Sequence, residues 1–370
     1  MGKRLYYLDY LRVLLTVLVI LHHTAIAYGA GGSWIYVDVD QSELTFTGIL
    51  LTLFTAINQS FFMGLFFFLS GYFTPGSYDR KGARVFLMDR LIRLGIPLLF
   101  YVFILGPIIS YVAQSRDSMT LLNYYKTEVL TFHTIHIGPL WFVEALLLFA
   151  VIYVLIRLLT GWKLDVKAPT IRNLIVTAIL LGISAFLLRL VSPVGEGVLG
   201  LQFGYFPSYI FLFISGVVAY RQKWLDTFLE KKELVKTWWW ISLTAIPILP
   251  LGFILTGALE GNLSFEGGVN FQSFLYAMWE PFVAFGMILW LLYQFEKSVN
   301  QPHPFGGALA DAAYTVFIIH PAIVVGLTLL LHGVLIPPLL KFMLVGFIGA
   351  AICFFCGYLI TKIPFAKRVV

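Results

Sequence analysis

Long apolar runs recur from one end of the chain to the other, and they constrain its fold more than any other feature. Each run has about the 17–25 residues that a membrane-spanning helix needs, or nearly so. The runs cover residues 11–28, 47–73, 94–113, 139–160, 174–191, 206–220, 237–256, 272–294, 313–333 and 338–361. None shows the polar-apolar alternation of an outer-membrane barrel. The sequence therefore predicts an all-α polytopic membrane protein with about ten transmembrane helices in a single domain, residues 1–370.

The positions of Lys and Arg predict the orientation of these helices. Most of the 25 basic residues lie at the two chain ends and in the connections that follow the even-numbered runs. The positive-inside rule makes those segments cytoplasmic, so an even number of spans places both termini in the cytoplasm. The net charge of +6 follows from this sidedness and does not indicate a nucleic-acid partner.

Arg12 and His23 stand eleven residues apart in the first run. At 100° per residue their side chains return to within roughly 20° of one helix face, and the helical rise separates them by about 16 Å. A fixed cation near the cytoplasmic surface and a proton-transfer group in the outer leaflet can bind a long anionic molecule and react at its far end. The structural alternative is an Arg that reaches lipid head groups and a His that hydrogen-bonds between helices. Because His22 and His23 interrupt the end of the run, we expect it to stay as the first span and not to be removed as a signal peptide.

Two groups near the cytoplasmic ends of the second and third runs are candidate binding residues. Ser70 and Gly71 end a Phe-rich stretch, where a ligand or a neighbouring helix can approach the backbone closely. Arg90 and Arg93 share one helix face, and two guanidinium groups can bind a phosphate with paired hydrogen bonds. Helix packing and simple charge anchoring are the structural alternatives.

Three polar residues lie inside spans near the outer surface. Glu144 and Glu280 are intramembrane carboxylates, which are candidates to orient an imidazole or to bind substrate hydroxyl groups. His320 precedes Pro321, which frees a backbone carbonyl because proline has no N–H. His320 can therefore either hydrogen-bond that carbonyl or contact a substrate.

Two short patterns resemble metal sites but lack the remaining ligands. His133 and His136 have suitable spacing, and Cys353 and Cys356 form a C-x-x-C pair inside the last run. Zinc needs further Cys or His ligands, and none is evident near either pattern. We predict no metal site, with the cysteines packed as small apolar side chains.

The candidate residues together resemble the acyltransferase 3 family, which comprises integral-membrane O-acyltransferases of bacterial envelope and secreted glycans. The motifs that carry the resemblance, in their order along the chain, are Arg12-x10-His23, Ser70-Gly71-Tyr72, Arg90-x-x-Arg93, Leu140-Trp141-Phe142 with Glu144, and Tyr314 to His320-Pro321. The resemblance covers essentially the whole chain. Without a fused extracytoplasmic esterase-like domain, the chain looks like the stand-alone branch that includes the glucan succinyltransferases.

The resemblance implies a cytoplasmic acyl-coenzyme A (acyl-CoA) donor, either acetyl-CoA or succinyl-CoA. Its phosphates would bind near Arg90, Arg93 and the Ser70-Gly71 backbone. Its pantetheine arm would pass Arg12, so that the thioester reaches the outer leaflet. The implied setting is the bacterial inner membrane, with the lipid bilayer, a carbohydrate acceptor and a possible homodimer as partners.

The same resemblance implies how the acceptor would react. His23 would be the general base, with Glu144 as its orienting partner, and Glu280 and His320 would bind the acceptor. The segment 141–144 departs from the Trp-Ser-Leu type of sequence in many members with the fused domain, so we expect different acceptor handling here.

Two other functions remain open on sequence alone. A proton-coupled transporter or lipid flippase could use Arg12, His23, Glu144 and Glu280 as a relay. The chain has no evident internal repeat, which counts against that function. A non-catalytic subunit of a polysaccharide synthase would tolerate replacement of His23.

Overall fold

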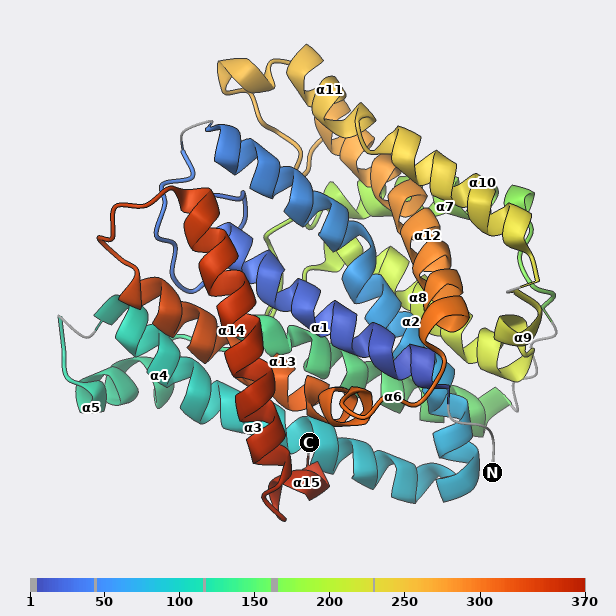
Figure 1. Ribbon diagram of the computed structural model, residues 1–370, viewed down its shortest axis with the longest axis horizontal. Helices are drawn as coiled ribbons and strands as arrows, with labels where there is room; N and C mark the ends of the chain where they lie inside the picture. The colour runs from blue at the N-terminus through green and yellow to red at the C-terminus, as the bar shows by residue number, and fades with distance from the viewer. Residues whose placement is uncertain (1–4, 43–44, 116–117, 161–165, 229, 370) are drawn as a thin grey trace.

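The described part of the chain is helical and contains no strand (Figure 1). The computed structural model describes residues 5–42, 45–115, 118–160, 166–228 and 230–369. The α-helices are α1 (Tyr6–Ala27), α2 (Phe46–Arg90), α3 (Ile96–Phe100), α4 (Gly106–Ser110), α5 (Leu121–Tyr124), α6 (Trp141–Thr160), α7 (Ile171–Arg189), α8 (Phe206–Arg221), α9 (Trp224–Phe228), α10 (Lys232–Ala245), α11 (Ile248–Leu255), α12 (Phe271–Val299), α13 (Gly306–Leu330), α14 (Pro338–Thr361) and α15 (Ala366–Val369). Wider helical turns at Leu91–Gly95 and Tyr101–Leu105 join α2, α3 and α4 into one path, and a third at Tyr111–Ser115 continues α4.

Nine helical stretches of the described residues are long and apolar enough to cross a membrane. One of them, Phe46–Gln114, contains two of the predicted runs, 47–73 and 94–113. As a straight helix it would be about 100 Å long, more than three times the hydrocarbon core. At Gly82 the backbone leaves the helical region, with φ 72° and ψ 167°, and the chain then returns through α3 and α4 (Figure 1). The prediction of an all-α polytopic membrane protein is confirmed.

Both chain ends lie in the lower half of Figure 1, whereas the connection between α13 and α14 lies at the left. The cytoplasmic location of the termini stays a prediction.

Helix α1 lies in the middle of the bundle, where it contacts α2, α12, α13 and α14 (Figure 1). Many side chains on α1 therefore face other helices, which can supply partners for His22 and His23.

Helices α2 and α8 pack with their backbones unusually close. A Cβ atom added at Gly71 would overlap the carbonyl oxygen of Phe213, and one added at Gly216 would overlap that of Phe68. Small residues at such crossings allow membrane helices to approach without a side chain between them. The glycine in the Ser70-Gly71 motif thus has a packing role in this fold.

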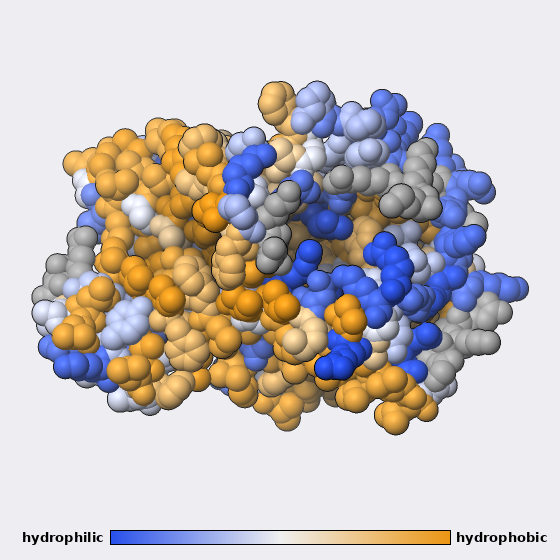
Figure 2. Space-filling view, turned by 90° about the horizontal axis from the view of Figure 1, so that it is seen from below, coloured by the Kyte–Doolittle hydropathy of each residue, from blue (hydrophilic) through white to orange (hydrophobic). Residues whose placement is uncertain are grey.

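Large apolar side chains cover the outward faces of the bundle. Leu187 on α7 and Phe347 and Phe355 on α14 are each more than half exposed. Figure 2 shows the protein from below: apolar residues cover the left side, and hydrophilic residues gather around a hollow to the right. Apolar surface of this extent marks contact with lipid.

We predict that Gly216→Ala destabilises the protein, because its methyl group would overlap the α2 backbone. Overpacking of this kind costs about 1–3 kcal/mol. Gly326→Ala is the matched control, since a Cβ there meets no heavy atom within 4 Å. The measurement is the melting temperature of each purified variant in detergent, and equal values for the two variants would contradict the packing argument.

Candidate active site

His23 of α1 and His320 of α13 form a hydrogen bond across the centre of the protein. Nδ1 of His23 lies 3.1 Å from Nε2 of His320. The indole of Trp34 stacks on the His23 ring, with ring centroids 4.0 Å apart and planes 15° apart. His320 is fully buried, whereas His23 is half-buried. The structure therefore brings together two residues that the sequence marked separately.

The backbone defect at Pro321 orients His320. In a regular helix the N–H of residue 321 would donate to the carbonyl of Phe317, but proline has no N–H. Nδ1 of His320 lies 2.7 Å from this carbonyl oxygen and takes the place of the missing donor. The expectation that His320 can hydrogen-bond the freed carbonyl is confirmed.

This contact determines where the protons of both rings lie. A carbonyl oxygen only accepts, so Nδ1 of His320 carries the proton and its Nε2 is an acceptor in the neutral ring. Nδ1 of His23 must then donate to Nε2 of His320. The remaining nitrogen of neutral His23, Nε2, keeps its lone pair and can accept a proton from a substrate.

The connection after α1, which the sequence predicts to be on the outer side, covers His23 through Trp34 and is tied to α14 and to the connection that follows α13. Both oxygens of Asp38 are engaged: Lys341 Nζ donates to Oδ2 at 2.7 Å, and His332 Nδ1 lies 2.8 Å from Oδ1. The Asp38 amide also donates to Ala27 O at 2.9 Å. We call residues 29–42 the outer cap. These contacts hold the cap, and thus Trp34, against the end of α1.

Three aromatic rings from three separate sequence motifs meet beside His320. Phe66, Phe142 and Phe317 have centroid separations of 5.5 to 6.4 Å, and Phe317 lies 5.8 Å from the His320 ring. Their contact places apolar side chains on this side of the histidine pair.

At the other end of α1, Arg12 lies next to the Phe-rich stretch of α2. Its guanidinium carbon is 4.7 Å from the centroid of Phe73, and Nη1 is 3.2 Å from Asp9 Oδ1. Ser70 is half-buried one turn before Phe73 and its carbonyl accepts a hydrogen bond from Thr74 at 2.7 Å. Arg12 and the Ser70-Gly71 segment therefore lie close together.

Arg90 and Arg93 lie where the chain leaves α2. Arg90 stacks over Phe86 at 5.2 Å, and Nε of Arg93 is 3.4 Å from Asp89 Oδ1. The hydroxyl of Tyr314 donates to the carbonyl of Arg93 at 3.0 Å, which connects this turn to α13. Arg93 is exposed and can reach a ligand in the surrounding solvent.

Glu144 and Glu280 occupy different surroundings. Glu144 is half-buried, and its Oε2 is buried without a hydrogen-bond partner in the described part of the chain. Glu280 is buried and forms an ion pair with Arg189 of α7 at 2.5 Å, between the rings of Tyr205 and Tyr276. The hydrogen-bond partner of His23 is His320, where the sequence suggested Glu144. The catalytic role of Glu144 and the substrate-binding role of Glu280 stay predictions.

For several residues of this region, nothing in the neighbouring sequence predicts the contacts that they make. Trp34 and Asp38 lie in a polar connection, and His22 meets Asn58, whose Nδ2 is 3.3 Å from His22 Nδ1. Arg189 offers a weak signal, since a basic residue at the outer end of a span departs from the positive-inside pattern.

Comparison with known proteins identifies the family of the chain. The acyltransferase 3 family model, described as an acyltransferase domain, matches residues 5–361. The protein called glucans biosynthesis protein C is 30% identical over 152 residues in Escherichia coli strain K12 and in Escherichia coli O1:K1 / APEC. These alignments cover 39% of this chain and 37% of each relative, so the chain matches well under half of their length. No solved structure matches the chain. Because the family match extends over nearly all of its residues, the chain belongs to the acyltransferase 3 family.

Proposed function

We propose that this membrane protein transfers an acyl group, acetyl or succinyl, from cytoplasmic acyl-CoA to a hydroxyl group of an extracytoplasmic glycan or related acceptor. The observation that carries the proposal is the hydrogen-bond series from Phe317 O through His320 to His23, which leaves Nε2 of His23 as the free base. Family membership supports the reaction class. The relatives' printed name, which refers to glucan biosynthesis, supports a glycan acceptor.

In the proposed reaction, Nε2 of His23 takes the proton of the acceptor hydroxyl as its oxygen attacks the thioester carbonyl carbon. The tetrahedral intermediate then collapses, the carbon–sulfur bond breaks, and the proton on His23 passes to the departing thiolate. The products are an acyl ester and free coenzyme A thiol. His320 stays a hydrogen-bond acceptor throughout and stabilises the imidazolium form of His23, as a third group does in other base-assisted acyl transfers.

The proposed donor lies along α1 from the cytoplasm. Arg12 beside Phe73 offers a cation next to an aromatic face, which suits the junction between the phosphates and the pantetheine arm. Arg90 and Arg93 would bind the phosphates.

The proposed acceptor approaches from the side of the outer cap. Because His320 already occupies Nδ1 of His23, we assign Glu144 to the acceptor hydroxyl groups, which its unpartnered Oε2 can accept. Glu280 would help to bind the acceptor indirectly. Its ion pair with Arg189 lies between the rings of Tyr205 and Tyr276 and would hold those two side chains in place.

His23→Ala should abolish acyl transfer while the protein stays folded and inserted. Loss of a positioned general base typically costs about 10²–10⁴-fold in rate. The assay follows thiol release from acetyl-CoA and succinyl-CoA, together with mass spectrometry of surface glycans from a deletion strain carrying each variant. His133→Ala, which changes an exposed loop histidine, is the control. Full activity of purified His23→Ala would refute the role of His23 as the general base.

His320→Phe should lower kcat by at least about tenfold with little change in the donor KM, because the wrong His23 tautomer becomes populated. His320→Gln should recover part of this loss, since its amide oxygen can accept from Nδ1 of His23. Steady-state kinetics of both variants provide the measurement. Equal kcat values for the Phe and Gln variants would show that His320 only fills space.

Replacing Arg90 and Arg93 together by Ala should mainly raise the KM for acyl-CoA. The control removes the same charge from the same connection through Arg80→Ala with Arg84→Ala. An unchanged KM in the Arg90/Arg93 variant would assign that pair to topology alone.

Direct titration of acyl-CoA in detergent separates the proposed enzyme from a transporter, which has no reason to bind the donor saturably.

A further inference from the structure

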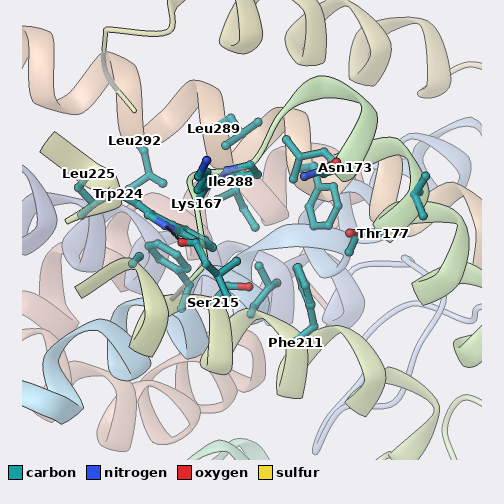
Figure 3. Close-up of a pocket in the computed structure, with 18 of the residues that line it drawn as sticks. Lys167, Asn173, Thr177, Phe211, Ser215, Trp224, Leu225, Ile288, Leu289 and Leu292 are labelled. Carbon is teal, nitrogen blue, oxygen red and sulfur yellow. Dashed lines mark hydrogen bonds between the residues drawn. The ribbon is translucent and has the colours of Figure 1, made fainter. Parts of the chain in front are cut away.

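A pocket lies between α7, α8 and α12, away from the histidine pair. Its volume is about 610 Å³, within the range of small-molecule sites. Figure 3 shows Ile288 and Leu289 of α12 on one side of it and Phe211 and Ser215 of α8 on the other. Nothing in the proposed acyl transfer uses this space.

The pocket and the histidine site lie on different faces of α2. Phe68 lines the pocket, whereas Phe66 belongs to the aromatic group beside His320. Two helical steps rotate a side chain by about 200°, so these neighbours point in nearly opposite directions. The pocket therefore lies on another face of α2 than the aromatic group beside His320.

The walls of the pocket are apolar. Phe68, Leu212, Phe285, Ile288 and Leu292 form much of its surface. Val176 of α7 also lines it and is 49% exposed, which places one side of the pocket beside the lipid-facing surface. Hydrocarbon chains suit such walls, which offer few partners for the amide groups of a pantetheine arm.

The rim of the pocket is basic. Lys167 and Arg172 line it and are exposed, and neither has an ion-pair partner among the described residues. No carboxylate belongs to the lining that the structure describes. The indole N–H of Trp224 donates to Val166 O at 2.9 Å and fixes the segment that carries Lys167. Under the predicted topology this rim lies at the cytoplasmic leaflet, where anionic lipids attract Lys and Arg.

We propose that this pocket binds an anionic phospholipid of the cytoplasmic leaflet. The acyl chains occupy the apolar space and reach it from the bilayer beside Val176. The head-group phosphate binds Lys167 and Arg172, and the planar Arg fork can donate two hydrogen bonds to it. The proposal does not depend on acyl transfer.

The test measures lipid binding to the full-length protein in detergent by native mass spectrometry. Phosphatidylglycerol is the anionic probe and phosphatidylcholine with the same chains is the reference. The wild-type protein should prefer phosphatidylglycerol, and Lys167→Gln with Arg172→Gln should weaken that binding by about fivefold for each charge removed. Lys231→Gln with Lys232→Gln, at the start of α10, is the matched control and should bind as the wild type does.

A second variant tests the apolar space. Ser215→Trp should fill the pocket and reduce binding of both lipids, with an unchanged melting temperature showing that the fold is intact. If it melts lower, Thr177→Leu replaces it as the filling variant. His23→Ala should keep full lipid binding. Equal phosphatidylglycerol binding by wild type and the Lys167/Arg172 variant would overturn the proposal, and so would displacement of the lipid by acetyl-CoA.

Discussion

The carbonyl oxygen of Phe317 is the polar group on which the arrangement of the His23–His320 pair depends. Pro321 removes its backbone donor, and in a water-poor interior a polar group must find another partner. Nδ1 of His320 supplies it, and this contact fixes the protons on both histidine rings. A local backbone defect in α13 thereby sets the proton positions on His23 of α1, the residue that we propose as the base.

The need of a buried polar group for a partner also explains other polar contacts inside the bundle. Arg189 and Lys341 are two of the basic residues that the predicted topology places away from the cytoplasm, and each meets a buried carboxylate, Glu280 and Asp38 respectively. Burying either charge alone would be costly, whereas the pair is tolerated because each ion compensates the other. The Lys341 contact also holds the outer cap. These two ion pairs therefore connect helices and connections that are far apart in the sequence.

The proposed donor path and the proposed lipid pocket use α2 in different ways. One face of α2 contributes to the aromatic group beside His320, and another lines the pocket with α8. The close packing of Gly71 and Gly216 keeps these two helices together between the sites. The two proposed ligands, acyl-CoA and an anionic phospholipid, both carry phosphate and long flexible chains. They differ in the protein surface that would surround those chains.

The sequence by itself determined the all-α membrane fold, because hydrophobic runs and helical periodicity are local properties that neighbouring residues carry. It also singled out His23, His320 and Pro321 as residues of unusual character. Only the tertiary structure decided that His320 is the partner of His23 and that Arg189 is the partner of Glu280, because 297 and 91 residues separate the members of these pairs. Which residues meet depends on how the helices pack. Helix packing results from many contacts along each helix surface, such as those at Gly216, and no pattern near the paired residues encodes it.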